Sequence, residues 1–578
     1  MRLLAPAECS ATRRRALGSG LLVAVAAARA GAQTPPALDT TIHPRCERVE
    51  SRTNLAALSG RTVEAFDVTT GAPRSSRFPL LARLTTRTHI RTQQTTLRRF
   101  VLLAPHDTVD TLRVAESLRR LRRLRYLDDV LLVANDCGPD VPVRITLIAR
   151  DAMSFRPDVR FNSGTAANAA TGTATASPSS YSVGFEERNL LGTGRELRAT
   201  AIGTGGRNGY ALGAGDPTVF GSLYAARGRL ARNPLENATA FSIRPPDREL
   251  AELWRGEFGI ASTRRAGAAA HGASFARSGG QALIARRAAA DDGLGAATFL
   301  IAGAEAERTR LIAAPHAIIG GPSTVRRDFA GLDLGVGRYA EQYGAITWLL
   351  PDARVVDVPR GVEGEFIAGL GRDQLVGGAA AHLDLWTGRM WLPMPGLLAV
   401  ADVWGTGYLR RGSAVSGGSA RAALTGVARQ HRGYVYARVA VERLAAPDPD
   451  QQALLGFDPT VRIIATRTRL AQTAVVGLLE RDWRVTSRVG HISLDLAGFG
   501  AGSYRASRRT PGADVNQLST AIGGGVHLVP NAVGRSALRF DYVVPVTHGR
   551  GGHPKPYLAA SVAPWLLFDR FRDGRRGR

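Results

Sequence analysis

The sequence contains no apolar run long enough to cross a lipid bilayer as an α-helix. A membrane helix needs about 20 predominantly apolar residues in succession, and the most apolar stretch, Leu21–Ala26, is much shorter. Membrane proteins that span with helices are therefore excluded. If the chain enters a membrane, it must do so as a closed β-barrel, because only closure pairs every backbone group within lipid.

Two common catalytic signatures are also absent. The sequence contains neither Gly-x-Ser-x-Gly, which places a hydrolase nucleophile, nor His-Glu-x-x-His, which binds catalytic zinc. The acid pairs Glu186-Glu187 and Asp291-Asp292 are adjacent, so within a strand they point to opposite faces. The glycine-rich segment Gly203–Gly209 lacks the lysine of a phosphate-binding loop. We therefore predict that the protein is not an enzyme and has no catalytic residue, cofactor or metal site.

Lysine is nearly absent, since Lys555 is the only one. Lysine and arginine together number 75 against 49 acids, which gives a formal net charge of +26. Such a charge suits nucleic acid or an anionic surface as a partner, but it also suits a genome that favours arginine. The sequence shows no compact basic module with interleaved aromatic residues, so we favour the second interpretation and predict no nucleic-acid partner.

The N-terminus has the pattern of a secretory signal peptide. Arg13–Arg15 form a basic region, Leu21–Ala26 an apolar region, and Ala30–Ala32 a small-residue cleavage site. We predict a signal peptide over residues 1–32, followed by a polar, proline-containing arm over residues 33–59.

Cysteine is scarce, with three residues in the whole chain. Cys9 lies within the signal peptide, which leaves Cys46 and Cys137 in an exported and therefore oxidising context. We predict a disulfide between these two residues; two unpaired thiols are the alternative.

Residues 60–152 predict a small α+β domain. Its clearest element is a helix over Thr111–Tyr126, in which leucines recur every three residues and Asp110 is placed to cap the N-terminus. The arginines of this helix are interpreted as a solvated face. The other expected elements are a strand at Arg61–Val68, a short helix within His89–Leu103, and strands at Asp128–Ala134 and Val141–Ala149.

Helical periodicity disappears after this segment, and short alternating runs broken by turn residues take its place. The first is a predicted hairpin at Tyr181–Thr200, whose turn is Leu190-Leu191-Gly192-Thr193-Gly194. About 410 residues divided among strands of about 9–11 residues with their connections suit about sixteen strands. A soluble propeller or sandwich would show the same local pattern. The signal peptide and the preceding α+β domain favour a transmembrane β-barrel.

Several segments resemble the BamA/TamA family of outer-membrane proteins, within the bacterial surface antigen superfamily. TLRVAESLRRLRRLRYLDDV, from Thr111, resembles the second helix and second strand of a POTRA domain. GFEERNLLGTGREL, from Gly184, is similar to the start of that family's barrel, and LGFDPTVRIIATRTRL, from Leu455, to its inward-folded loop. In that loop Val461-Arg462 matches the family core, whereas Ile463 and Ile464 stand where glycine and an aromatic residue are typical.

The resemblance implies a periplasmic POTRA-like domain at residues 60–152 and a sixteen-stranded outer-membrane barrel at residues 153–568. It implies insertion or translocation of other proteins, with unfolded clients, outer-membrane lipid, periplasmic chaperones and accessory lipoproteins as partners. A passive pore or structural barrel without a client is the alternative function.

The resemblance also implies that Arg462 is tucked into the barrel against Asp482 and Asp495; a solvent-exposed arginine is the alternative. We further expect Tyr557–Phe568 to be the last strand, paired with a first strand near Pro157–Ser163. In that arrangement Trp565 and Phe568 lie at a membrane interface, and residues 569–578 form a basic periplasmic tail.

Overall fold

The structure of the chain is a computed structural model. It describes residues 47–50, 58–71, 90–124, 126–138, 141–152, 154–162, 165–168, 173–176, 180–204, 207–222, 224–234, 236–245, 253–265, 274–291, 296–313, 326–340, 343–348, 355–359, 361–373, 378–410, 415–445, 473–489, 492–506, 516–530, 536–546 and 557–564. The predicted signal peptide, Cys46, Arg462, Trp565, Phe568 and the tail at 569–578 lie outside the described residues, and what we expect of them stays a prediction.

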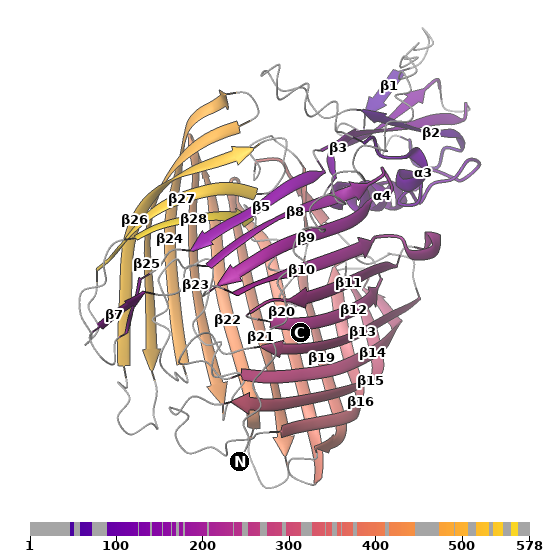
Figure 1. The fold of residues 1–578 in the computed structure, drawn as a ribbon. Helices are drawn as coiled ribbons and strands as arrows, with labels where there is room; N and C mark the ends of the chain where they lie inside the picture. The colour runs from indigo at the N-terminus through magenta and orange to yellow at the C-terminus, as the bar shows by residue number, and fades with distance from the viewer. Residues whose placement is uncertain are drawn as a thin grey trace, which may run out of the picture.

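The N-terminal unit, by which we mean the described residues between 47 and 152, is a four-stranded sheet with two helices (Figure 1). The strand order is β1-β3-β4-β2, in which β2 and β4 are parallel and the other pairs antiparallel. The elements are β1 Glu47–Glu50, β2 Val63–Gly71, α3 Gln94–Arg98, α4 Thr111–Arg123, β3 Leu127–Asp136 and β4 Val143–Asp151. From β2 to β4 the elements follow the predicted order of strand, two helices and two strands. Strand β1 was not predicted, because it lies within residues 33–59, which were expected to form an arm.

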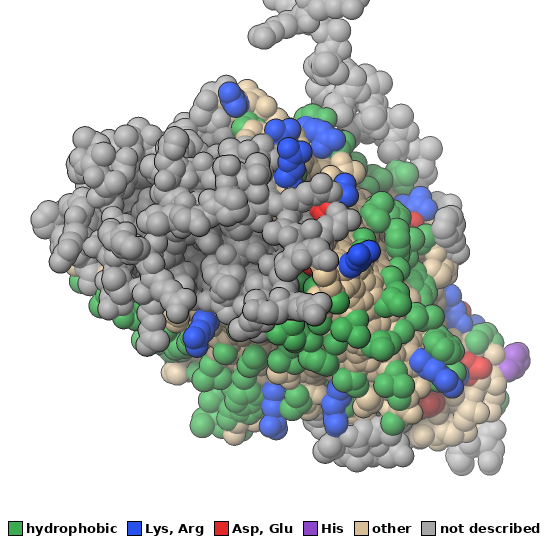
Figure 2. All heavy atoms as spheres, turned by 90° about the horizontal axis from the view of Figure 1, so that it is seen from below, with side chains coloured by type: hydrophobic (Ala, Val, Ile, Leu, Met, Phe, Trp, Pro, Cys, Tyr) green, Lys and Arg blue, Asp and Glu red, His purple; other side chains and the backbone are tan. Residues whose placement is uncertain are grey.

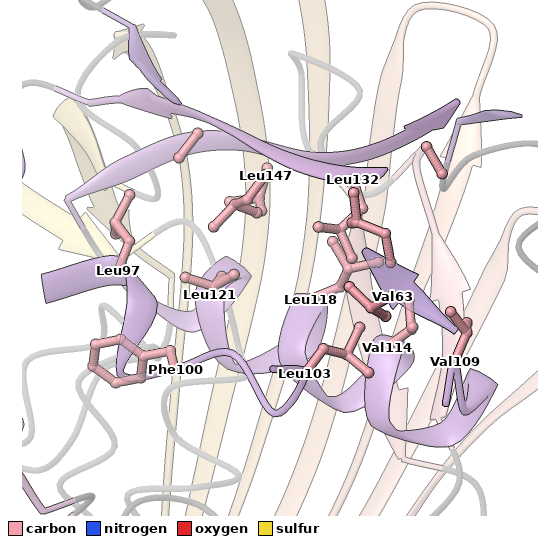
Figure 3. Packing of buried hydrophobic residues seen from close by; sticks show 14 of the residues in the cluster. Val63, Leu97, Phe100, Leu103, Val109, Val114, Leu118, Leu121, Leu132 and Leu147 are labelled. Atoms are coloured by element: carbon pink, nitrogen blue, oxygen red, sulfur yellow. The ribbon is translucent and has the colours of Figure 1, made fainter. Parts of the chain in front are cut away.

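Helix α4 packs one face on the sheet and begins where expected. The carboxylate of Asp110 accepts a hydrogen bond from the backbone N–H of Leu112 at 2.8 Å, which satisfies an N–H that the helix itself leaves unpaired. Figure 3 shows Leu118 and Leu121 of α4 directed toward Leu132 and Leu147 of the sheet. This apolar layer joins the helix and the sheet into one core.

Two arginines of α4 do not belong to the solvated face that the sequence suggested, although Arg113 is exposed. Arg119 and Arg120 are buried, and both pair with the buried carboxylate of Glu116. Because Glu116 lies three and four residues before them, all three side chains meet on one helix face. Leu112, expected in the apolar stripe, is 62% exposed instead.

Most of the remaining described chain forms a closed antiparallel barrel. Its first ten strands are β5 Phe155–Asn162, β8 Ser180–Leu190, β9 Arg195–Thr204, β10 Arg207–Asp216, β11 Ala225–Arg232, β12 Glu236–Arg244, β13 Trp254–Arg265, β14 Ser274–Asp291, β15 Ala296–Ala313 and β16 Arg326–Ala340. The second ten are β19 Gly361–Asp373, β20 Gly378–Met394, β21 Leu397–Arg410, β22 Val415–Gln430, β23 Gly433–Ala445, β24 Thr473–Val489, β25 Ile492–Ala506, β26 Asn516–Pro530, β27 Ser536–Pro545 and β28 Tyr557–Pro564.

The barrel fold is confirmed. The described residues contribute twenty strands to it, more than the predicted number of about sixteen. The estimate allowed too many residues per connection. Only two residues join β20 to β21, and only two join β22 to β23. The predicted hairpin at Tyr181–Thr200 corresponds to β8 and β9, and β28 closes the barrel beside β5, where the first and last strands were expected to meet.

Each barrel strand alternates between a buried inner face and an exposed outer face, as strand geometry requires. On β20, His382, Asp384 and Trp386 are buried, whereas Leu385 between them is exposed. The outer face is apolar: Leu332, Leu334 and Leu370 expose 70%, 65% and 68% of their surface. Figure 2 shows hydrophobic side chains over much of the barrel wall visible in that view.

Two short hairpins and one turn of 3-10 helix complete the described structure. They are β6 Thr165–Asn168 with β7 Thr173–Ala176, β17 Tyr343–Ile346 with β18 Val356–Pro359, and η2 Val219–Gly221. None of the described helices is both long enough and apolar enough to cross a membrane.

The register of β1 against β3 bears on the predicted disulfide. Glu47 lies opposite Asp136 in this antiparallel pair, and Cys137 follows Asp136 directly. Cys137 is bonded in a disulfide. Its pairing with Cys46 stays a prediction, because Cys46 lies outside the described residues.

Candidate functional site

The turn between β8 and β9 joins the barrel to the N-terminal unit through a buried polar network. The amide Nδ2 of Asn189 donates to Thr92 Oγ1 at 2.8 Å. Thr92 in turn donates to Asp151 from its backbone N–H at 3.0 Å and from its hydroxyl at 2.6 Å. Asn189 Oδ1 accepts a hydrogen bond from the backbone N–H of Gly194, so the same side chain also holds its own turn together.

Gly192 brings the turn against the start of α3. Its carbonyl oxygen accepts hydrogen bonds from the backbone N–H of Gln93 at 2.9 Å and from Thr96 Oγ1 at 3.3 Å. Its φ of +76° belongs to the left-handed region, and a Cβ there would lie 2.3 Å from the carbonyl oxygen of Arg91. Only glycine therefore allows this approach.

The phenol of Tyr126 fills the other side of the turn. A Cβ on Gly194 would lie 2.6 Å from Tyr126 Oη. Burial, reinforced by the carboxylates of Asp151, Glu196 and Asp216, raises the pKa of Tyr126, so the phenol stays neutral. The sequence motif Asn-Leu-Leu-Gly-Thr-Gly is thus the contact surface between the barrel and the N-terminal unit.

A second connection runs through the β17–β18 hairpin, which follows β16. Strands β8, β10 and β16 all run toward the N-terminal unit, because successive barrel strands are antiparallel. The hairpin therefore lies at the same end of the barrel. The guanidinium of Arg122 pairs with Asp357 at 3.2 Å, and that of Arg119 lies 4.6 Å from the ring centre of Tyr343. Helix α4 thus rests on the hairpin, which accounts for its buried arginine face.

The hairpin packs its apolar side on the inner barrel wall. Ile346, Val356 and Val358 share a buried cluster with wall residues of β20 to β23, namely Trp386, Met390, Leu398, Val400, Val427 and Tyr434. The hydroxyl of Tyr434 donates to the carbonyl oxygen of Trp348 at 2.9 Å. The hairpin therefore covers the inner wall of β20 to β23 at the mouth of the barrel.

The third feature is a group of charged side chains on the inner wall of β24 to β27. We call it the inner-wall cluster, and its members are Glu480, Asp482, Arg484, Asp495, His527, Arg539 and Asp541. Register builds it: Arg484 lies opposite Asp495, Asp495 opposite His527, and His527 opposite Arg539. Paired residues share a face of the sheet, so these side chains form a row across the wall.

The cluster is closely interconnected. Arg484 Nε lies 3.2 Å from Asp495 Oδ1, and Arg539 pairs with Glu480. His527 is fully buried between two carboxylates, with Nδ1 3.3 Å from Asp482 Oδ1 and Nε2 3.2 Å from Asp541 Oδ1. Four carboxylates face two guanidinium groups, so the cluster has a formal charge of −2 when His527 is neutral.

Both predicted acids, Asp482 and Asp495, are buried on the inner wall, as the alternation of their strands suggested. The structure brings them into one cluster but gives each a partner that the sequence did not indicate, His527 and Arg484 respectively. The docking of Arg462 on them remains a prediction.

Sequence reasoning missed Glu480, His527, Arg539 and Asp541 as members of this site. The run Gly523-Gly524-Gly525 just before His527 was the available signal, since consecutive glycines on a strand leave space for neighbouring side chains. Gly525 does so: a Cβ there would lie 2.1 Å from Asp541 Oδ1. The pairing register that joins the four residues was not readable from the sequence.

The described barrel holds another buried histidine between carboxylates. His382 Nδ1 lies 2.6 Å from Glu305 Oε1, and His382 Nε2 lies 3.6 Å from Asp384 Oδ2. His382 also stacks on Tyr408, with ring centres 4.7 Å apart.

The structure is similar to several solved structures. CdiB from Escherichia coli is 9% identical, with a TM-score of 0.45, over 90% of this chain and 81% of that chain. CdiB from Acinetobacter baumannii is 11% identical, with a TM-score of 0.40, over 90% and 78%. BamA from Haemophilus ducreyi lacking POTRA domains 1–3 is 11% identical, with a TM-score of 0.32, over 86% and 85%. At such identities the likeness concerns the fold alone.

The sequence matches no known family model, and no curated protein matches it.

The junction yields a first prediction. Gly192→Ala combines a left-handed backbone, which costs a residue with a side chain about 1–2 kcal/mol, with a clash against the backbone of Arg91. We expect faster amide hydrogen exchange in Gln94–Arg98, because the turn can no longer dock on α3. Hydrogen exchange with mass spectrometry on the folded protein measures this directly.

Gly221→Ala is the matched control, since Gly221 has a φ of +77° but open space where the Cβ would lie. Equal exchange in α3 for the two variants would show that the approach of Gly192 does not hold the junction.

Proposed function

We propose that the protein is an outer-membrane β-barrel, with its N-terminal unit in the periplasm, that assists insertion or translocation of other proteins without covalent chemistry. The observation that carries this proposal is the position of the N-terminal sheet beside the closure of the barrel. Strand β4 ends at Asp151, β5 begins at Phe155, and β5 neighbours β28. A client strand bound to this sheet would be held next to the seam where β5 meets β28.

The outer face of the barrel supports a membrane location. Strands such as β14 and β15, each of 18 residues, are long enough to cross a bilayer with a tilt. Large apolar side chains project from them and their neighbours without protein cover, as with Leu300 and Leu332. A soluble protein rarely exposes so much contiguous apolar surface, whereas lipid is a favourable solvent for it.

The N-terminal sheet supports a role in binding clients, as its likeness to a POTRA domain implies. Strand β2 stands at one end of the order β1-β3-β4-β2. An edge strand presents backbone N–H and C=O groups to which an extended peptide can add as a further strand. Unfolded barrel proteins are rich in such extended segments and are the client class that this edge suits.

The seam supports the same function. Within the described residues β5 and β28 have eight residues each, against 18 in β14 and β15. A ladder between two strands of eight residues holds fewer hydrogen bonds than one between strands of 18, so less free energy is needed to part it. A seam of this kind can open laterally to a client, and in a passive pore it would serve no purpose.

Depletion of the protein tests the proposal. We expect several other barrel proteins to fall in abundance in the outer membrane, because their insertion depends on it. Quantitative mass spectrometry of isolated outer membranes provides the inventory, and expression of the wild-type chain from a plasmid is the control that should restore it. An inventory that depletion leaves unchanged would favour a passive pore or structural barrel.

The β17–β18 hairpin argues against a pore that is open at rest, because it lies on the inner wall at the barrel mouth. We predict that replacing residues 343–359 with a short Gly-Ser linker raises single-channel conductance in planar bilayers. Replacement of residues 165–176, which contain the β6–β7 hairpin outside the barrel sheet, is the control. If the conductance of the two variants matches that of the wild type, the hairpin does not obstruct the channel.

Arg462 is proposed to dock on the inner-wall cluster. Asp495 is fully buried, and its Oδ2 has no hydrogen-bond partner among the described residues, while Oδ1 lies beside Arg484. A guanidinium can engage such an oxygen while staying charged. Removing one partner of a buried pair costs about 3–5 kcal/mol, so we predict that Arg462→Ala lowers heat resistance and assembly yield.

Arg411→Ala is the comparison, an arginine between β21 and β22 that also lies outside the described residues. Heat-modifiable migration on gels measures the folded fraction of both variants. Equal yields and equal heat resistance would assign Arg462 to the solvent.

A further inference from the structure

We propose that Glu480, Asp482 and His527 form a binding site for a divalent transition metal, of which zinc is the representative, on the inner wall of the barrel. A suitable ligand atom from each residue lies within 4.8 Å of the other two, and all three side chains are buried. One imidazole with two carboxylates is a ligand set of the kind that zinc takes in proteins. The absence of any ligand-spacing motif explains why the sequence predicted no metal site.

Strand geometry places the three ligands together. Glu480 and Asp482 are two residues apart on β24 and therefore share its inner face. His527 reaches them from β26, across β25. The β25 residue opposite Asp482 is Ala497, whose own partner on β26 is Gly525. Small residues at these two positions leave room for the longer side chains to converge.

The distance between the ligand atoms of Asp482 and His527 suits a shared ion. Asp482 Oδ1 and His527 Nδ1 face each other at 3.3 Å, and ligand atoms on one tetrahedral zinc lie about 3.3–3.6 Å apart. Neither atom has a hydrogen-bond partner of acceptable geometry among the described residues, although both side chains are more than nine-tenths buried. A cation bound by both would satisfy two buried polar atoms at once.

Asp541 supplies the support that metal-binding histidines need. Its Oδ1 lies 3.2 Å from His527 Nε2, so a hydrogen bond donated by Nε2–H leaves the lone pair of Nδ1 directed at the site. Gly525 makes this approach possible, since a Cβ there would overlap Asp541 Oδ1. In this tautomer His527 Nε2 carries the proton, so it cannot also accept a hydrogen bond from Arg539 Nε, which lies 3.1 Å away. Arg539 pairs with Glu480 instead.

Charge favours a dication. The pairs Arg484–Asp495 and Arg539–Glu480 are each neutral. Asp482 and Asp541 remain on either side of a neutral imidazole, which gives the cluster its formal charge of −2. A divalent ion at Asp482 and His527 neutralises that charge inside the barrel wall, where uncompensated charge is costly.

The proposal is tested by measuring zinc binding to the full-length folded barrel in detergent, after metals have been removed with a chelator. Isothermal titration should show one zinc bound per chain at this site. His527→Gln should weaken its binding at least about tenfold, and Asp541→Asn about 10–100-fold through loss of the supporting hydrogen bond. His382→Gln, which changes the other buried histidine flanked by carboxylates, should leave it unchanged.

A second measurement separates metal binding from folding. Cobalt substituted for zinc should give the intense visible absorption of a tetrahedral site in the wild-type and His382→Gln proteins but not in His527→Gln. Heat-modifiable migration shows that each variant is folded. Absence of stoichiometric zinc in the wild type, or zinc binding that folded His527→Gln retains, would overturn the proposal.

Discussion

The pairing of backbone groups between neighbouring strands is the constraint on which the rest of the structure depends. Each barrel strand is paired on both edges, so the sheet has no free edge and must close on itself. Closure then separates an apolar outer face, represented by Leu332 and Leu370, from an inner face that collects the polar side chains. The buried acids and histidines lie in the barrel interior because this alternation places them on the inner faces of their strands.

Specific contacts link the barrel to the N-terminal unit. The hydrogen bonds of Asn189 and Gly192 join the first barrel hairpin to Thr92 and to the start of α3. At the same barrel end, Arg122 of α4 pairs with Asp357 of the β17–β18 hairpin. A displacement of the N-terminal unit would therefore act on the strands next to the seam and on the hairpin at the mouth together. In the proposed function this links binding of a client to opening of the barrel.

The inner-wall cluster occupies a different part of the same architecture. It lies on β24 to β27, close to the last strand, and connects four neighbouring strands through side chains such as Asp482, Asp495 and His527. Such links stiffen the wall on one side of the seam, where β27 and β28 are short. Docking of Arg462 and binding of a metal concern different carboxylate oxygens of this cluster, Asp495 Oδ2 and Asp482 Oδ1.

Features that arise from local patterns could be predicted from the sequence. Alternation predicted the strands and the first hairpin, and the signal peptide and the α+β domain favoured a barrel over a soluble β fold. Threefold leucine spacing predicted α4, and Asp110 was recognisable as its cap. Alternation also placed Asp482 and Asp495 on the inner face. Features that depend on register and on contacts between distant segments could not be predicted in this way. The number of strands depends on connections as short as two residues. Arginines of α4 are buried because they contact a hairpin more than two hundred residues away in the sequence. The partners of Asp482 and Asp495 are set by pairing across four strands. A register is a relation between strands, and shifting it by one residue exchanges the two faces without changing either strand's own pattern, so the sequence could place each acid on a face but could not name its neighbour.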